Sequence, residues 1–391
     1  MKIVVDDKIP YIRETLERLA DEVVYKKGSA IGPEDVRDAD ALIVRTRTRC
    51  DEQLLKGSKV QFVATATIGY DHIDTAWCEQ NGIKWTNCPG CNSGSVAQYV
   101  ESALLTLIEN GELRIENYDN QTSAVNQGVQ SNHNSQFSTL NSPLTLGVIG
   151  CGHVGSKVCR VGERLGLRVL VNDPPLEKTI ENGELRMENY DNQTSAVNQG
   201  VLSNHNSQLS TLNSKFDFVS LETIAHEADI ITFHVPLDET TKHLADEAFF
   251  MKLQRKPVII NSSRGGVVDE QALLQALDDG LVSQAVIDTW ENEPDISRTL
   301  LYKCYIGTPH IAGYSADGKV NADNMVVEAL CRHFALPLPP KIEPPMLPAD
   351  FHYTGNPLEL YNAMDDSRKL KEHPERFEEL RGNYPLRREV F

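Results

Sequence analysis

The sequence lacks several features that mark specialised classes of protein. No apolar run approaches the roughly 18 residues of a transmembrane helix, and the N-terminal MKIVVDDKIPY has neither the apolar core nor the cleavage site of a secretory signal. The sequence also lacks the cysteine density of a disulfide scaffold: eight residues scattered over 391 positions are ordinary usage, which favours free thiols. We therefore expect a cytoplasmic protein without membrane contacts.

Basic residues are also in short supply. The 38 lysines and arginines are outnumbered by 56 acidic residues, and the resulting net charge of -18 argues against a nucleic-acid partner. A local basic pocket could still bind a small anionic substrate. Cys88 and Cys91 have the spacing of zinc ligands, but no second pair completes a site, so we expect no metal.

The alternation of short apolar runs with helical patterns predicts two α/β domains in tandem. A chain of 391 residues has room for two or three domains. A first series of strands is expected at 2–7, 22–27, 41–46 and 59–67, and a second at 144–150, 168–173, 228–236, 256–264 and 283–290. Such apolar β-branched runs are typical of parallel sheets covered on both faces.

Two long polar segments interrupt this pattern. Residues 108–142 return almost unchanged as residues 180–214, and only three positions differ between the copies. Two separated copies cannot stack as a solenoid, and their Asn, Gln and Ser content could not form a core. We interpret them as inserted surface loops, and a partner-binding role is the less favoured alternative.

A glycine-rich motif predicts a dinucleotide site. Gly150, Gly152 and Gly155 follow an apolar strand directly and open a helical segment, and Asp173 ends the next strand. A pyrophosphate needs this tight turn at a helix N-terminus, and the carboxylate would accept hydrogen bonds from the adenosine ribose. Because Asp173 would repel an additional phosphate, the expected cofactor is NAD and not NADP.

Three polar residues near the ends of the later strands form a candidate catalytic set. Arg264 offers a planar fork suited to a substrate carboxylate, and His310 titrates in the range needed to pass a proton. Glu293 could hold the imidazole oriented and basic. Together these groups suffice for oxidation of the alcohol at carbon 2 of a hydroxy acid.

A basic segment precedes the second half of the first domain. In VRTRTRC, a strand alternation would place Arg45, Arg47 and Arg49 on one face and Thr46 and Thr48 on the other. Either face could meet a phosphate. A solvated strand end paired with surface acids is the alternative interpretation, and the sequence does not choose among the three arginines.

The motifs together resemble those of the D-isomer-specific 2-hydroxyacid dehydrogenases. The resemblance rests on the glycine-rich loop, RGGVVDE, ENEP and TPHIAGY. It implies an α/β fold of two Rossmann-like or flavodoxin-like parallel-sheet domains with a cleft between them, plus a small C-terminal dimerisation module. The expected parts are a substrate-binding domain at 1–94 completed by about 314–335, an NAD-binding domain at 95–313, and a linker with the dimerisation module at 336–391.

The same resemblance implies an activity and further site residues. VRTRT, TATIGYDHID and the C-terminal LRGNYPLRRE are similar to the branch of the family that oxidises 4-phospho-D-erythronate with NAD in pyridoxal phosphate biosynthesis. His310 would then take the hydroxyl proton, Arg264 would bind the carboxylate and Glu293 would support His310. The implied substrate contacts are Thr46, Thr67, Tyr314 and, less firmly, Arg45; the implied NAD contacts are Gly150, Gly152, His153, Val154, Gly155, Asp173, Asp288 and Gly313.

Three other functions stay open on the sequence alone. The chain could oxidise another D-2-hydroxy acid such as 3-phosphoglycerate, or it could be a non-catalytic NAD sensor on the same fold. The retained arginine, glutamate and histidine argue against the sensor. The two insertions could also have made the chain inactive, and the one that follows Asp173 could perturb cofactor binding. In each case the expected small-molecule partner is an anion, and a homodimer is expected.

Overall fold

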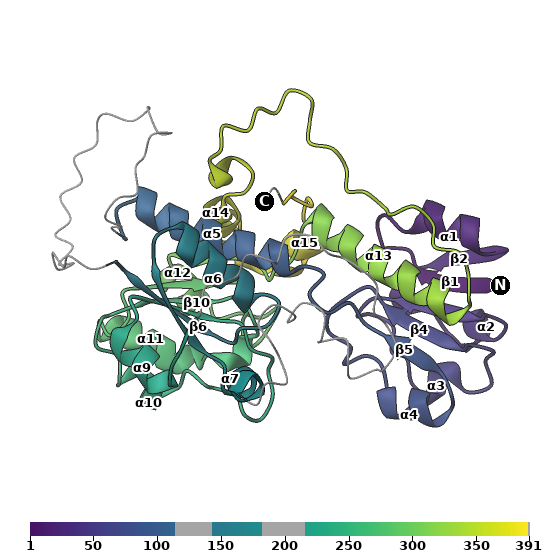
Figure 1. Cartoon of the computed structure of the whole chain (residues 1–391), viewed down its shortest axis with the longest axis horizontal. Helices are drawn as coiled ribbons and strands as arrows, with labels where there is room; N and C mark the ends of the chain where they lie inside the picture. The colour runs from purple at the N-terminus through teal and green to yellow at the C-terminus, as the bar shows by residue number, and fades with distance from the viewer. Residues whose placement is uncertain (114–142, 182–215, 390–391) are drawn as a thin grey trace. The chain divides into compact units, whose positions relative to one another are not determined.

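The chain divides into two compact units. The computed structural model describes residues 1–113, 143–181 and 216–389 (Figure 1). Unit 1 consists of residues 1–95, 314–351 and 386–391, and unit 2 of residues 96–313 and 352–385. Most of both polar copies lies outside the described residues.

Unit 1 is built on a five-stranded parallel sheet. Its order is β2-β1-β3-β4-β5, with β1 at Lys2–Asp6, β2 at Glu22–Lys26, β3 at Ala41–Val44, β4 at Phe62–Thr65 and β5 at Lys84–Thr86. This is the flavodoxin-like strand order. β3 and β4 are completely buried, as expected for apolar runs covered on both faces. The fifth strand was not predicted from the sequence.

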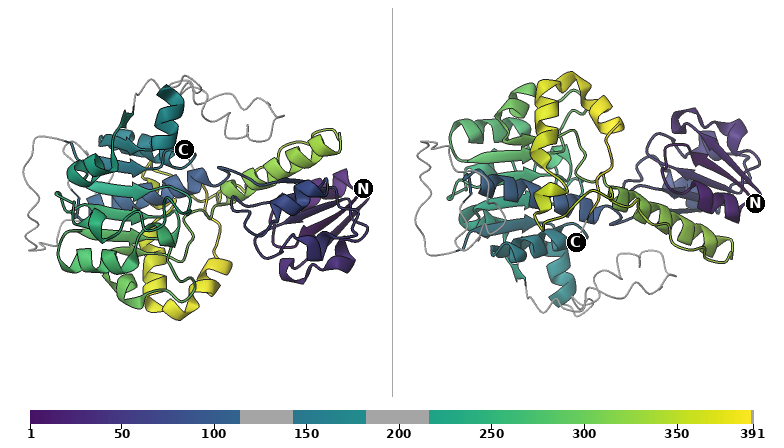
Figure 2. Two further views of the ribbon diagram at one scale, coloured as in Figure 1. Left: turned by 90° about the horizontal axis from the view of Figure 1, so that it is seen from below. Right: turned by 90° about the horizontal axis from the view of Figure 1, so that it is seen from above.

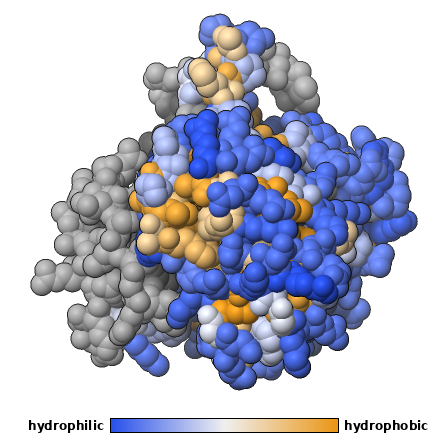
Figure 3. Space-filling model, turned by 90° about the vertical axis from the view of Figure 1, so that its right-hand side faces the viewer, coloured by the Kyte–Doolittle hydropathy of each residue, from blue (hydrophilic) through white to orange (hydrophobic). Residues whose placement is uncertain are grey.

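Helices cover both faces of the unit 1 sheet. They are α1 at Arg13–Leu19, α2 at Pro33–Val36, α3 at Glu52–Leu55, α4 at Thr75–Gln80 and α13 at Ala316–His333. α13 buries Val326 and Leu330 in one core with Ile3 and Ile43 of the sheet. The face of the molecule in Figure 3 is mostly hydrophilic, with apolar residues gathered in patches.

Unit 2 contains a seven-stranded parallel sheet in the order β12-β11-β10-β9-β6-β7-β8. The strands are β6 at Thr145–Ile149, β7 at Arg168–Asn172, β8 at Asp217–Phe218, β9 at Ile230–Phe233, β10 at Val258–Asn261, β11 at Gln284–Ile287 and β12 at Ile306–Gly307. The order reverses beside β6, as in dinucleotide-binding folds. The expected pair of parallel-sheet α/β domains is thereby confirmed.

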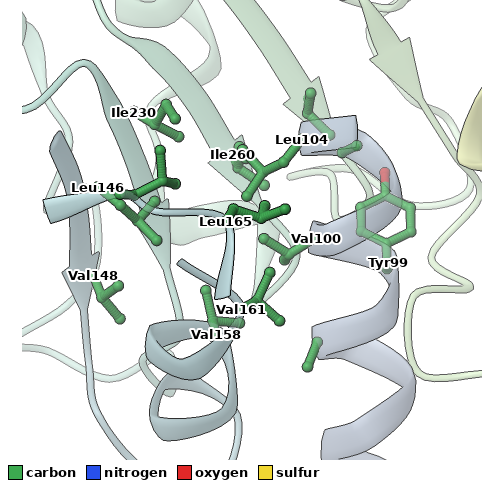
Figure 4. Close-up of a cluster of buried hydrophobic side chains, with 14 of the residues drawn as sticks. Tyr99, Val100, Leu104, Leu146, Val148, Val158, Val161, Leu165, Ile230 and Ile260 are labelled. Atoms are coloured by element: carbon green, nitrogen blue, oxygen red, sulfur yellow. The ribbon is translucent and has the colours of Figure 1, made fainter. Parts of the chain in front are cut away.

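The core of unit 2 joins this sheet to α5 at Ser93–Glu109 and α6 at Gly155–Arg164. Figure 4 shows Val100 and Leu104 of α5 opposite Val158 and Val161 of α6, with sheet residues completing the cluster. The other helices are α7 at Pro174–Glu181, α9 at Leu221–Glu227, α10 at Glu247–Phe250, α11 at Glu270–Asp278, α12 at Arg298–Lys303, α14 at Ala363–Glu372 and α15 at Phe377–Gly382.

The first polar copy was predicted to be a loop from residue 108 onward, which is wrong for residues 108 and 109, the last two residues of α5. α5 continues to Glu109, and Gly111 then adopts a left-handed φ of 75° that turns the chain. Leu113 is 3% exposed and its N–H donates to the Leu107 carbonyl at 3.1 Å. The copy therefore begins with a helix end and an apolar anchor, which its polar composition concealed.

The C-terminal part of the chain is shared between the units. α14 packs against the edge strand β12, where the Gly307 N–H donates to the Ser367 hydroxyl at 2.9 Å. Figure 2 shows α14 and α15, in yellow, along one side of the larger sheet. Residues 386–389 instead join unit 1, where Arg387 is 8% exposed and donates to the carbonyls of Ser95 and Tyr314.

All eight cysteines are buried and unpaired, as the sequence predicts. The thiols of the CPGC segment lie within a turn of unit 1, where Cys88 donates to the Thr65 and Ala322 carbonyls at 3.4 Å. Among the described residues, no helix combines the length and apolar character that crossing a bilayer requires.

Candidate active site

The predicted site residues of unit 2 share one edge of its sheet. Gly150 follows β6, Asp173 follows β7, Arg264 lies beyond β10, Asp288 follows β11 and His310 lies beyond β12. All these strands run parallel, so their carboxyl ends meet at the same edge. In open α/β sheets this edge binds the ligand.

The glycine-rich loop is shaped by close backbone approaches. Gly150 has a φ of 86°, and a Cβ there would lie 2.6 Å from the His234 carbonyl oxygen. A Cβ at Gly155 would lie 1.9 Å from the Gly150 carbonyl oxygen. Only glycine fits both positions. Gly152, His153 and Val154 form the turn between them, which leads into α6 and presents the helix N-terminus that a pyrophosphate needs.

The Asp173 carboxylate holds the glycine-rich loop by accepting hydrogen bonds from backbone N–H groups. One carboxylate oxygen accepts from the Cys151 N–H at 2.8 Å, and the other accepts from the Leu176 N–H at 3.0 Å at the start of α7. Each oxygen retains a further lone pair for a ribose hydroxyl. The second polar copy begins at the far end of α7, so Asp173 is followed by an ordered helix and not directly by the insertion.

His310 and Glu293 form a hydrogen-bonded pair. Nδ1 of His310 lies 2.9 Å from Oε1 and 2.8 Å from Oε2 of Glu293, and the Trp290 N–H donates to Oε1 at 3.0 Å. Burial raises the pKa of Glu293, but the interactions with His310, the Trp290 N–H and Arg381 together outweigh it and the pKa is lowered. An ionised carboxylate on Nδ1 fixes the proton there and leaves the lone pair on Nε2 for a substrate.

Asp288 holds the loop that carries His310. Its carboxylate is completely buried and accepts from the Thr308 hydroxyl at 2.7 Å, the Ile311 N–H at 2.8 Å and the Ala312 N–H at 3.0 Å. The His310 N–H donates to the Asp288 carbonyl at 2.9 Å, and His310 has a left-handed φ of 55°. This strained backbone persists because its surroundings determine it. Gly313 ends the loop, where unit 2 gives way to unit 1.

Arg264 presents its guanidinium to solvent at the same edge. Nη1 donates to the Ser263 carbonyl at 2.8 Å, and the Asn261 side chain donates to the Arg264 carbonyl at 2.9 Å. Gly265 allows the close approach of the next turn, since a Cβ there would lie 2.0 Å from the Trp290 backbone. The remaining N–H groups are available to a carboxylate.

A second histidine near the glycine loop has a different character. His234 follows β9, and its Nε2 lies 2.9 Å from the Thr232 hydroxyl. Burial lowers the pKa of His234 to about 3. The ring therefore stays neutral at physiological pH and is poorly suited to cycling a proton, unlike His310 with its carboxylate partner.

The basic segment of unit 1 is not a strand, so the predicted alternation of its side chains is wrong. β3 ends at Val44, the last residue paired with β4, and the chain turns at Thr46 and Arg47. Thr46 is exposed, whereas Thr48 is buried and donates to the Gly28 carbonyl at 2.9 Å. Alternating polar residues carry no apolar face that would keep them in the sheet.

Among the three arginines of this segment, Arg45 is tied to the sheet edge. Its Nε lies 3.6 Å from Oδ2 of Asp6, whose side chain is 1% exposed at the end of β1. Arg49 is 79% exposed and pairs with Asp51 at 2.8 Å. Arg45 thus lies near a buried charge partner, whereas Arg49 pairs at the surface.

Thr67 lies one strand away from Arg45 and belongs to a small polar network. Its hydroxyl lies 2.6 Å from that of Thr65 and donates to the Gly69 carbonyl at 2.9 Å. Nε2 of His72 lies 3.1 Å from the Thr65 hydroxyl, and burial lowers the pKa of His72. The sequence did not indicate Thr65, which supports Thr67 from inside the sheet.

Tyr314 also lies in unit 1 and is held by two cations. Its carbonyl accepts from Arg387 at 3.0 Å, and Nζ of Lys319 lies 4.6 Å from the centre of its ring. The predicted residues therefore form two groups, each described within its own unit. The first comprises Arg45, Thr46, Thr67 and Tyr314, and the second comprises Arg264, Glu293, His310 and the cofactor-binding residues.

Comparison with known proteins gives a consistent family. The NAD-binding domain of the D-isomer-specific 2-hydroxyacid dehydrogenases matches residues 196–312. Erythronate-4-phosphate dehydrogenase of Bacteroides thetaiotaomicron is 48% identical, with 100% of this chain and 97% of the relative covered. The enzyme of that name from Porphyromonas gingivalis is 34% identical, with 100% and 94% covered.

Solved structures support the fold. An NAD-complexed D-isomer-specific 2-hydroxyacid dehydrogenase from Lactobacillus delbrueckii ssp. bulgaricus is similar with a TM-score of 0.60 at 21% identity, with 88% of this chain and 100% of that chain covered. NAD-bound 3-phosphoglycerate dehydrogenase from Entamoeba histolytica is similar with a TM-score of 0.58 at 24% identity, with 86% and 95% covered.

Proposed function

Since the chain belongs to the erythronate-4-phosphate dehydrogenases of the D-isomer-specific 2-hydroxyacid dehydrogenase family, we propose that it oxidises 4-phospho-D-erythronate with NAD. The product is (R)-3-hydroxy-2-oxo-4-phosphooxybutanoate, in a route to pyridoxal 5'-phosphate. The observation that carries the proposal is the Glu293–His310 pair beside Arg264 at the sheet edge that also bears the glycine loop. An NAD sensor would have no use for this acid–base pair.

Unit 2 fits NAD by its own geometry. Gly150 and Gly155 have no room for a Cβ, so the chain turns tightly between them and leads into the N-terminus of α6, which suits a pyrophosphate. Asp173 would accept from the ribose hydroxyls, and Gly313 would contact NAD at the end of the His310 loop. Asp288 is buried and would act on the cofactor only by holding this loop. When bound, the nicotinamide accepts the hydride that leaves carbon 2 of the substrate.

The chemistry at carbon 2 is divided among three side chains. His310 takes the hydroxyl proton on Nε2 as the C–H bond breaks and the carbonyl forms, and it returns a proton in the reverse direction. Glu293 stabilises the imidazolium through Nδ1. Arg264 binds the carboxylate through its guanidinium fork, which orients carbon 2 for hydride transfer.

The unit 1 residues are proposed to take part in substrate recognition. Thr46 and Thr67 bring hydroxyl groups just beyond the ends of two adjacent strands, and Arg45 adds positive charge near Asp6. The Thr67 hydroxyl donates to the Gly69 carbonyl, so it would have to turn to donate to a phosphate. Tyr314 adds a further hydroxyl. We assign these residues to substrate recognition and residues 1–94 to the substrate-binding domain. In this proposal the recognition residues distinguish phosphoerythronate from shorter hydroxy acids.

The test is NADH formation by the purified full chain with NAD and 4-phospho-D-erythronate, followed by absorbance. We expect activity with this acid, much less with 3-phosphoglycerate and D-lactate, and a loss of at least about hundredfold in His310→Ala. His373→Ala is the matched control, because that histidine lies half-exposed on the surface beside Glu375. Equal or faster turnover of 3-phosphoglycerate would reassign the substrate.

An inactive chain would be resolved by NAD titration. Binding without turnover of any hydroxy acid would support the sensor, whereas absent binding would point to the insertion after α7. We further propose that the protein works in the cytoplasm, which agrees with eight unpaired thiols, and that it forms a homodimer through its C-terminal part. Sedimentation of the full chain tests the dimer.

A further inference from the structure

We propose that Arg381 is a positioning residue for the acid–base pair: it fixes the Glu293 carboxylate and sets how strongly that carboxylate favours the protonated form of His310. This rests on the proposed function, in which His310 moves the proton. Arg381 lies 71 residues after His310 in a charged segment that carries no catalytic motif.

The contact joins α15 to the active-site edge within unit 2. Nη1 of Arg381 lies 3.4 Å from Oε2 of Glu293, the same oxygen that lies 2.8 Å from Nδ1 of His310. The Arg381 side chain is 27% exposed and that of Glu293 is 17% exposed. Guanidinium, carboxylate and imidazole thus form a continuous chain in a partly desolvated place, where charge interactions are stronger than in water.

The helix that carries Arg381 is anchored independently of this contact. Phe377 is 1% exposed and packs in the same apolar core as Leu370 and Trp290. Arg376 pairs with Glu379 on the outer side of the helix at 2.6 Å. The loop residues Pro309 and Ile311 and the helix residue Leu380 line one cavity of about 140 Å³, so the helix borders the catalytic loop directly.

Each end of Glu293 is thereby held by a different donor. Oε1 accepts from the Trp290 N–H, and Oε2 faces Arg381, while both oxygens contact His310. Without Arg381 the carboxylate keeps one fixed anchor besides the imidazole and can rotate. A rotated carboxylate no longer holds Nε2 of His310 towards the substrate.

The charge of Arg381 acts in a defined direction. A guanidinium remains positive at all relevant pH values. Burial raises the pKa of Glu293, and the His310 hydrogen bond, the Trp290 N–H and Arg381 oppose it, so Glu293 stays ionised. A cation near the pair also disfavours the imidazolium. Removing it should stabilise protonated His310, so that a smaller fraction is basic at a given pH.

Other ionisable groups face the Glu293–His310 pair, and none of them is altered in the variants compared. Asp288 lies under the His310 loop, Glu270 of α11 interacts with Glu293, and Glu378 lies 3.9 Å from Arg381. Their contributions are present in wild type and variants alike. A difference between the variants therefore reports Arg381.

The experiment compares Arg381→Gln, which removes the charge, with Arg381→Lys, which keeps it. The control is Arg376→Gln, which removes a surface arginine of the same segment. The NMR titration of the His310 ring, assigned by its loss in His310→Ala, should move to higher pH by on the order of half a unit in Arg381→Gln. Arg381→Lys and Arg376→Gln should titrate as wild type does.

Kinetics supply a second readout. In Arg381→Gln we expect kcat for phosphoerythronate oxidation to fall roughly tenfold with KM nearly unchanged, and the acid limb of the kcat profile to move to higher pH. Arg381→Lys should restore the position of the acid limb and only part of kcat. A purely structural arginine would instead lower the melting temperature while leaving both the titration and the pH profile in place.

Coincident His310 titrations in wild type and a folded Arg381→Gln would overturn the proposal. The NMR readout needs no substrate, so it decides the role of Arg381 even where no hydroxy acid reduces NAD. Such inactivity of the wild type would instead contradict the proposed function. The two failures are therefore separate observations.

Discussion

Asp288 holds the backbone of His310 and of the two residues after it. Its carbonyl oxygen accepts from the His310 N–H at 2.9 Å, and its carboxylate accepts from the N–H groups of those two residues. His310, the proposed proton acceptor, therefore lies on a loop whose conformation is imposed by the buried acid that follows β11. Burial raises the pKa of Asp288, while its hydrogen bonds oppose that shift.

We expect Asp288→Asn to lower the free energy of unfolding by about 1–3 kcal/mol, because an amide NH₂ cannot accept from the N–H groups of the loop. kcat should fall with the displaced histidine while the KM for NAD changes little. Thermal unfolding and steady-state kinetics measure both effects. Thr308→Val removes the hydroxyl that donates to Asp288 and that also lies 2.8 Å from the Tyr99 hydroxyl, but it keeps both N–H contacts of Asp288 and should lower kcat less. A rise in the KM for NAD alone would instead identify Asp288 as a cofactor contact.

Gly155→Ala should abolish NAD binding. The new methyl group would lie 1.9 Å from the Gly150 carbonyl oxygen, a distance that no Cβ tolerates, so the loop must open. Calorimetric titration with NAD measures the loss. Gly382→Ala is the matched control, because no atom lies within 4 Å of a Cβ added there. Wild-type affinity in Gly155→Ala would contradict the assignment of this loop to the pyrophosphate.

Asp173→Asn tests the ribose contact together with one loop contact, because an amide NH₂ cannot accept from the Cys151 N–H while the oxygen caps Leu176. Asparagine remains a good cap for the Leu176 N–H at the start of α7, but the negative charge is lost. We expect NAD to bind roughly tenfold more weakly and discrimination against NADP to shrink. The ratio of kcat/KM for the two cofactors is the measurement. Asp217→Asn, an exposed acid on β8, should leave that ratio unaltered.

The stability of unit 1 should depend on Asp323 in a pH-dependent way. This side chain of α13 is 1% exposed and accepts from the Tyr11 N–H at 3.1 Å, with Lys319 nearby. Burial raises its pKa to about 7 in the folded protein, above the value of about 3.9 expected in the unfolded chain. Its contribution to stability is full below the unfolded value and is lost as pH rises through 7.

We therefore expect Asp323→Asn to unfold at a higher temperature than wild type at about pH 8, with the difference vanishing near pH 4. The amide oxygen can still accept from Tyr11. Melting curves at several pH values give the comparison. A difference that is constant across that range would show that packing, and not ionisation of Asp323, controls the result.

The parallel sheets and the Glu293–His310 pair were predictable because each has a strong local signal. Buried β-branched runs identify strands, and ENEP and TPHIAGY place an acid and a base after successive strands. The segment after Val44 was mispredicted because alternating Arg and Thr residues satisfy a strand pattern and a turn equally well. β3 stops at Val44 because its partner strand β4 ends at Thr65, and the sequence does not show this pairing.

Other site features depend on contacts that a sequence does not display. Arg381 meets Glu293 because α14 and α15 fold back onto unit 2, and no motif records that return. Thr65 and His72 support Thr67 from a buried strand and a loop seven residues later. Leu113 was hidden within a polar repeat because a single apolar residue gives no periodicity.

The eight buried thiols can report local opening of the structure around them. A thiol reagent can reach such a group only when the structure around it opens, so the rate of labelling at each cysteine reports a local opening equilibrium. Cys50, Cys78, Cys88, Cys91 and Cys331 lie in unit 1, and Cys151, Cys159 and Cys304 lie in unit 2. Mass spectrometry of partly labelled protein would thus measure the opening of the two units separately. Added NAD should slow only the labelling of the unit 2 cysteines.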